Sequence, residues 1–194
     1  MTKTTATYGS QYWLQVLVNQ APHLIDQALL TFSESRRKSR SKDEIIKIKW
    51  RSPIAPTFRE YKDTAFLDAL GIELHEMTRD QFWPKGGPAW DGLANTGDDR
   101  VFLIEAKGHI PEINTNPTGA SGPALDLIQK SLQETREFLS VKNSVDWAKS
   151  FYQYTNRVAH LYLLREINGI DAFLINVYFF NDYVMRGPCS IEEW

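Results

Sequence analysis

The strongest constraint on the fold is the segment VFLIEAK, residues 101–107, which runs almost unbroken through apolar side chains before it ends in charge. The turn-forming cluster NTGDD, residues 95–99, stands just before it, and the short segment 89–94 precedes that cluster. Two short apolar runs joined by such a cluster are typical of a β-hairpin. The sequence therefore predicts two paired strands between residues 89 and 107.

Helical patterns and further strands surround this hairpin. Apolar residues recur at helical spacing in five segments: 11–21, 22–32, 58–70, 123–139 and 145–167. Two more segments, 45–50 and 171–178, have the apolar patterns of strands. A mixed order that ends in a strand after helices favours the α/β (α+β) class. We expect a central mixed β-sheet flanked by helices.

Composition excludes several classes of protein. The chain has 194 residues, 42% of them hydrophobic, which is ordinary for a globular protein, and we expect one domain over residues 1–194. Cys189 is its one cysteine, which excludes an intrachain disulfide. The longest apolar stretch, 172–180, is roughly half the length that a membrane helix needs. Residues 1–10 lack the apolar core of a secretion signal, so we expect a cytoplasmic protein with no membrane partner.

The charge of the chain is nearly balanced but unevenly distributed. With 22 basic and 24 acidic residues, the chain is not expected to coat nucleic acid by bulk charge. Residues 34–51 nevertheless carry a net charge of +5. This segment is either a solvated linker or a loop that contacts phosphates. Its four candidate phosphate contacts, called the basic cluster below, are Arg36, Arg37, Lys38 and Arg40.

Three charged residues of the predicted hairpin can carry chemistry. Glu105 and Lys107 lie two residues apart on one strand, so their side chains leave the same face, and Asp91 on the partner strand can reach Glu105. Two converging carboxylates repel each other and are costly to bury, a cost that a divalent cation relieves. Such oxygen ligands suit Mg²⁺ or Mn²⁺, and Lys107 can position a water molecule. A hairpin with ordinary surface charges is the alternative interpretation.

These residues resemble the PD-(D/E)XK nuclease superfamily, which has the restriction-endonuclease-like fold. The resemblance begins at Pro88, Trp90 and Asp91, continues through the turn, and ends in the Glu105-x-Lys107 triplet. Pro88 stands three residues before Asp91 rather than directly before it. The similarity covers about residues 58–178 of the chain.

The resemblance implies both a fold and an activity. The implied fold is an αβββαβ core over residues 58–180, with residues 1–57 as a helical extension and basic loop. The implied activity is metal-dependent hydrolysis of phosphodiester bonds, in DNA rather than RNA, with Asp91 and Glu105 as ligands of Mg²⁺ or Mn²⁺. Lys107 is implied to act on the attacking water. Glu60, on the helix predicted over 58–70, is a further candidate catalytic residue.

A second group of candidates lies in the polar and aromatic run at residues 152–157. Gln153 and Arg157 are four residues apart and share a helix face; Tyr154 can stack on a base and Arg157 can hold a phosphate. The alternative is that the aromatic side chains are core and the two polar residues cross-link the helix.

Two other functions stay open besides a nuclease. One is a catalytically inactive protein of the same fold that binds nucleic acid or a protein partner. The other is an interaction protein whose hairpin only looks catalytic. A second copy of this chain, forming a homodimer, is among the partners that we consider.

Overall fold

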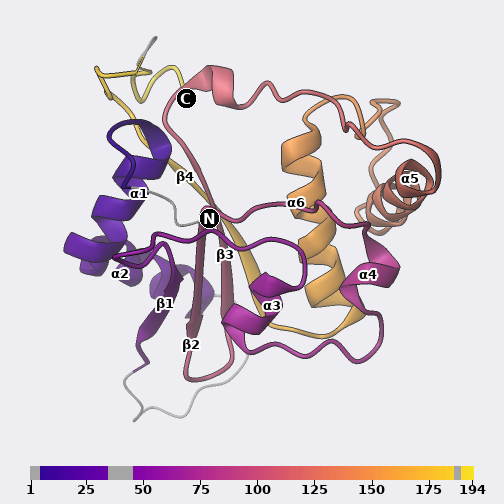
Figure 1. Ribbon diagram of the computed structural model, residues 1–194, viewed down its shortest axis with the longest axis horizontal. Coiled ribbons are helices and arrows are strands. Elements are labelled where there is room, and N and C mark those ends of the chain that lie inside the picture. Colours follow the sequence, from indigo (N-terminus) through magenta and orange to yellow (C-terminus); the bar gives the residue numbers. More distant parts are fainter. Residues whose placement is uncertain (1–4, 35–45, 186–188) are drawn as a thin grey trace.

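The computed structural model describes residues 5–34, 46–185 and 189–194 (Figure 1). Its centre is a four-stranded sheet formed, in spatial order, by β1 (Ile48–Ser52), β2 (Gly92–Thr96), β3 (Val101–Lys107) and β4 (Ala172–Tyr178). β1, β2 and β3 pair antiparallel, whereas β4 runs parallel to β3. The sheet is therefore mixed, which confirms the predicted α/β class with a central mixed sheet.

The described residues hold six α-helices: α1 (Gly9–Gln20), α2 (Pro22–Glu34), α3 (Ala65–Leu70), α4 (Arg79–Phe82), α5 (Gly122–Phe138) and α6 (Tyr152–Tyr162). α1 and α2 separate at Pro22 as predicted, because proline suits the first turn of a helix. A π-helical turn, Leu163–Ile167, extends α6. Among these helices, none combines the length and the apolar character needed to cross a lipid bilayer.

Helices cover both faces of the sheet. α1 and α2 pack on one face, against Phe102, Ile104 and Ala106 of β3. α3 and the turn that extends α6 pack on the other face, against Val101 and Leu103, and α4 and α5 pack behind α6. Figure 1 shows α1 and α2 to one side of the strands and α5 and α6 to the other. Burial of both faces explains why β3 is almost continuously apolar.

The predicted helix over residues 58–70 is wrong in its first half, because α3 begins only at Ala65. Phe58 and Asp63 take left-handed backbone conformations, with φ of 45° and 55°, and these interrupt a right-handed helix. Tyr61 instead forms an antiparallel bridge with Trp90. Pairing with the segment before β2 therefore overrides the helical spacing of the sequence.

Two other predicted boundaries shift, and one strand joins the sheet from outside the predicted core. The helix predicted over 145–167 begins at Tyr152, because residues 146–150 form a turn around Asp146 and Phe151 is left-handed, with φ of 54°. The first hairpin strand covers residues 92–96 rather than 89–94. β1, which the sequence assigned to an extension over residues 1–57, pairs with β2 and belongs to the central sheet.

Candidate active site

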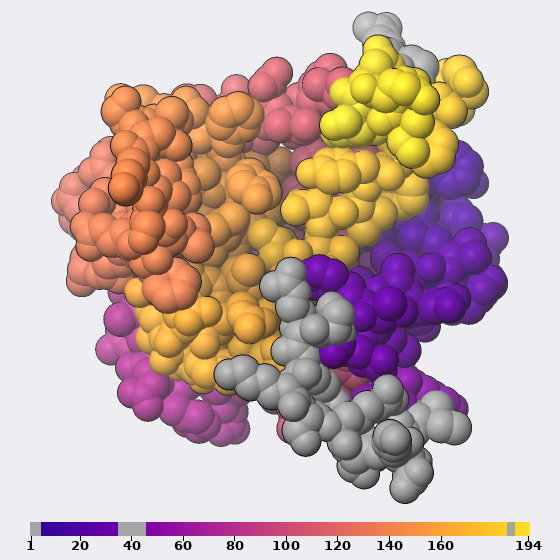
Figure 2. Space-filling view, turned by 180° about the vertical axis from the view of Figure 1, so that it is seen from behind, coloured from indigo at the N-terminus to yellow at the C-terminus, as the bar shows by residue number. Residues whose placement is uncertain are grey.

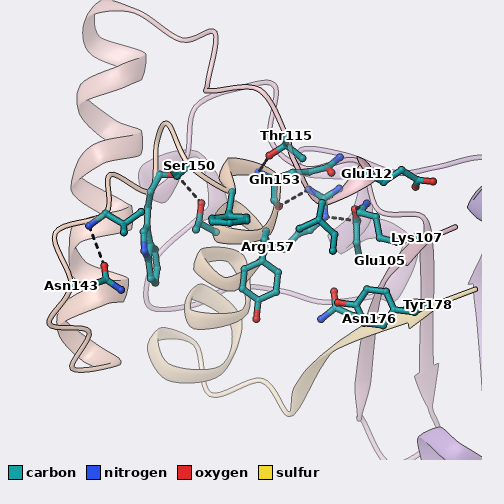
Figure 3. Close-up of a pocket in the computed structure, with 16 residues that line it drawn as sticks. Glu105, Lys107, Glu112, Thr115, Asn143, Ser150, Gln153, Arg157, Asn176 and Tyr178 are labelled. Atoms are coloured by element: carbon teal, nitrogen blue, oxygen red, sulfur yellow. Dashed lines mark hydrogen bonds and ion pairs between the residues drawn. The ribbon is translucent and has the colours of Figure 1, made fainter. Parts of the chain in front are cut away.

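Asp91, Glu105 and Lys107 meet at one end of the sheet. The register of β2 on β3 pairs Leu93 with Leu103, and continuing it by two residues brings Asp91 opposite Glu105. The Asp91 carboxylate accepts a hydrogen bond of 2.8 Å from the backbone N–H of Ala106, which fixes it against β3. Glu105 and Lys107 continue the face of β3 that packs on α3 and α6, and their side chains form an ion pair (Figure 3). The structure thus brings all three residues together.

The two carboxylates differ in how their charge is compensated. Glu105 is 4% exposed, and its two oxygens are ion-paired with different cations, one with Lys107 and the other with Arg157. Burial and the negative charge of Glu105 together raise the pKa of Asp91 to about 7, against the opposing effect of the Ala106 N–H and the two cations. Asp91 is therefore the member of the pair that a proton or another cation would neutralise.

Arg157 anchors Glu105 from α6. Besides its ion pair with Glu105, the guanidinium donates to the Gln153 carbonyl at 2.9 Å, to the Ala89 carbonyl at 3.0 Å and to the Asn156 side chain. These bonds tie α6 to β3 and to the segment before β2. These bonds have the form of the cross-link, the second interpretation that the sequence left open for Arg157, and its predicted contact with a phosphate stays a prediction.

A cavity of about 490 Å³ opens beside this cluster, between β3, β4 and the start of α6. Its wall includes Gln153, Tyr154 and Arg157, so the second group of candidate residues lies in the same pocket as Glu105 and Lys107. Figure 2 shows the surface hollowed between the segment leading into α6, in orange, and β4, in gold. The pocket therefore brings Glu105 and Lys107 together with the second group of candidates, whereas Asp91 is buried behind them and is not among its lining residues.

Sequence reasoning missed several residues of the pocket wall: Glu112, Thr115, Trp147, Phe151, Asn176 and Tyr178. Asn176 and Tyr178 are the β4 partners of Glu105 and Lys107 in the parallel register (Figure 3). This pairing could be found from the sequence only if the register of β4 on β3 were known. The other four come from segments outside the α-helices and strands that line the pocket, and two of them, Trp147 and Phe151, lie where the sequence predicted a helix.

Glu60 lies in the extended segment before α3 rather than on a helix. Its carboxylate accepts a hydrogen bond from the Gln11 side chain of α1. The described residues that line the pocket do not include it. Its predicted place on a helix is wrong, and its catalytic role stays a prediction.

The basic cluster, Arg36, Arg37, Lys38 and Arg40, lies outside the described residues. Its predicted contact with phosphates therefore stays a prediction.

The carboxylates of Asp91 and Glu105 could supply two protein ligands to a hard divalent cation. Within residues 5–34, 46–185 and 189–194, no group of three or more His, Cys, Asp or Glu side chains is arranged to hold a metal ion. Asp91 and Glu105 supply carboxylate oxygens from facing positions, and Mg²⁺ in proteins commonly keeps several waters beside one or two carboxylates. Burial and the charge of Glu105 both disfavour the ionised form of Asp91, a cost that a bound cation would relieve.

Comparisons with family models, with curated proteins and with solved structures found no match to this chain.

Proposed function

We propose that this protein is a metal-dependent nuclease that hydrolyses phosphodiester bonds in DNA and has a restriction-endonuclease-like core. The observation that carries the proposal is that Asp91 is bonded to the backbone N–H next to Glu105 and repels that carboxylate, while Glu105 and its ion-pair partner Lys107 line a pocket. Element order supports it as well. With α3 and α4 as insertions, the chain runs helix, three antiparallel strands, helices and a final strand parallel to the third.

Asp91 and Glu105 are the residues that would hold Mg²⁺ or Mn²⁺. When bound, the metal supplies charge stabilisation at the phosphate and lowers the pKa of a water molecule. The fit rests on the chemistry of the donors, because both side chains supply the carboxylate oxygens that these cations prefer and their like charges repel each other.

Lys107 and Arg157 have separate roles in this proposal. Arg157 is a positioning residue, because its bonds to two backbone carbonyls hold Glu105 in place. Lys107 is held by fewer hydrogen bonds: besides the ion pair with Glu105, its ammonium group donates to the Ala106 carbonyl at 3.5 Å, and its side chain is 13% exposed. It can therefore turn from Glu105 toward the pocket and hold the attacking water or a phosphate oxygen.

The test is cleavage of labelled DNA by purified protein in Mg²⁺ or Mn²⁺ and in EDTA. Asp91→Asn, Glu105→Gln and Lys107→Ala should each lower the rate by at least about 100-fold, the scale of a lost proton-transfer or charge-stabilising group. Lys130→Ala, at an exposed position of α5, is the matched control and should keep the wild-type rate. Metal-independent cleavage, or full activity in Lys107→Ala, would refute the mechanism.

A second candidate is a protein of the same fold that binds nucleic acid without cutting it. The observation in its favour is that both Glu105 oxygens are ion-paired with cations of the protein itself. DNA binding by the wild type with no cleavage in either metal would favour this alternative.

A further inference from the structure

The pocket that Glu105 lines has several aromatic side chains in its wall. Phe151 and Tyr154 are 50% and 52% exposed, and both line the pocket together with Trp147 and Tyr178. Exposed aromatic rings that gather in one concavity are typical of a binding surface, because a monomer gains no stability from leaving them in water. Phe151 also takes a left-handed backbone conformation at the start of α6, a strain that occurs preferentially at functional sites.

The charged and aromatic parts of the pocket are adjacent. Tyr178 is the neighbour of Lys107 across β3 and β4, and Asn176 is the neighbour of Glu105 (Figure 3). Tyr154 stands three residues before Arg157 on α6, so one turn of helix separates the ring from the guanidinium that holds Glu105. A phosphate at Lys107 would therefore have aromatic rings within the reach of the attached nucleoside.

The shape of the pocket favours an unpaired nucleotide over a duplex. Glu105 is buried at its inner end, so a scissile phosphate has to enter the concavity rather than touch a flat face. The volume of about 490 Å³ falls in the range of small-molecule sites, roughly 300–1,000 Å³. In a duplex the faces of each base are already stacked on their neighbours, whereas an unpaired base can stack on a protein ring.

The charge of the pocket wall points the same way. Its cations are Lys107 and Arg157 and its acids are Glu105 and Glu112, so the described lining carries no excess of positive charge. Neutralisation of backbone phosphates by Lys and Arg dominates the binding of duplex DNA, and the described lining has no surplus of such cations. Ring stacking is left as the main source of affinity.

We propose that the pocket binds an unpaired nucleotide of a DNA strand, its base stacked on Tyr154 and its phosphate at Lys107, so that the substrate is single-stranded DNA. This inference rests on the proposed function, because it takes the phosphate to lie where Lys107 meets Glu105. It adds the class of substrate and the residues that select it.

The test measures binding in an Asp91→Asn background, which lowers the negative charge facing the phosphate and, on the proposed mechanism, blocks cleavage. Fluorescence anisotropy compares a labelled single-stranded oligonucleotide with the blunt duplex of the same sequence, without divalent metal. The single strand should bind at least about tenfold more tightly. Adding Tyr154→Ala should weaken single-strand binding by about 5- to 150-fold, the range of base–aromatic stacking.

Two matched variants separate stacking from loss of structure. Tyr154→Phe keeps the ring and should bind like its parent, whereas Tyr183→Ala removes an exposed tyrosine that does not line the pocket and should have no effect. A 2-aminopurine in the strand gives a second readout, because stacking on Tyr154 should quench its fluorescence in the parent and in Tyr154→Phe but not in Tyr154→Ala.

Equal or tighter binding of the duplex would overturn the inference, as would an effect of Tyr154→Ala no larger than that of Tyr183→Ala. Metal-dependent cleavage of duplex DNA in preference to single strands would overturn it too, while leaving the proposed nuclease standing. Single-strand binding that depends on Tyr154, with no cleavage in any metal, would support this inference and refute the proposed nuclease activity.

Discussion

Replacement of Asp91 by Asn should stabilise the protein at alkaline pH and much less at acidic pH. The pKa of Asp91 is raised from 3.8 to about 7 by burial and by Glu105. Folding therefore retains a proton that the unfolded chain releases above pH 3.8, and the wild type loses stability as the pH rises from 3.8 to 7. The asparagine variant has no such proton, and its amide oxygen can still accept the hydrogen bond from the Ala106 N–H.

The size of the effect follows from about 1.4 kcal/mol per pKa unit. Between pH 5 and pH 7 the wild type should lose roughly 2 kcal/mol of unfolding free energy that the variant keeps, because Asp91 is half ionised at pH 7, and the loss should level off by pH 8. For a chain of this size that corresponds to roughly 1 M in the urea midpoint.

Urea unfolding at pH 5 and pH 8 of the wild type and Asp91→Asn measures this difference directly. Asp126→Asn, at an exposed position of α5, is the matched control. A stability difference between Asp91→Asn and wild type that is the same at both pH values would refute the reasoning from burial and charge.

Three further predictions concern the ion pairs, the metal and the basic cluster. Arg157→Met should destabilise the fold by about 3–5 kcal/mol in urea unfolding, because it leaves Glu105 buried without that partner. Adding Glu105→Gln should recover part of this loss, and strictly additive effects of the two substitutions would contradict the coupling. Mn²⁺ at about 100 times its dissociation constant should raise the melting temperature of the wild type at pH 8 by roughly 5–10 °C but not that of Asp91→Asn, and equal shifts would argue against a site at Asp91. Neutralising the basic cluster should flatten the dependence of log affinity for single-stranded DNA on log salt by up to about 3, whereas an unchanged slope would identify the cluster as a solvated linker.

The hairpin and its charged residues could be predicted because they are local. The turn cluster at residues 95–99 joins two apolar runs, and the alternation of side chains along a strand then sets which residues share a face. From that alone, Asp91, Glu105 and Lys107 are expected to converge, and in the structure they do. Few competing arrangements exist over so short a separation along the chain.

The rest of the site depends on contacts between distant segments, which no local pattern records. Asn176 and Tyr178 enter the pocket through the parallel pairing of β4, and Arg157 reaches Glu105 across 52 residues of sequence. In the segment before α3, the local pattern predicted the wrong structure. Its apolar residues have helical spacing, but the pairing of Tyr61 with Trp90 determines its conformation. Tertiary contacts settle both cases.

The same contacts explain how a buried carboxylate pair is stable in the protein before any metal binds. Lys107 and Arg157 compensate Glu105, and the raised pKa of Asp91 lets a proton neutralise the second carboxylate near neutral pH. On the proposed function, a metal that binds between the two carboxylates has to displace that proton, so metal affinity and the protonation of Asp91 belong to one equilibrium. Affinity for the metal should then increase with pH up to about 7 and change little beyond it, because above that pH the carboxylate is already ionised. On the proposed function, loss of this proton is therefore the step that prepares the two carboxylates for a cation.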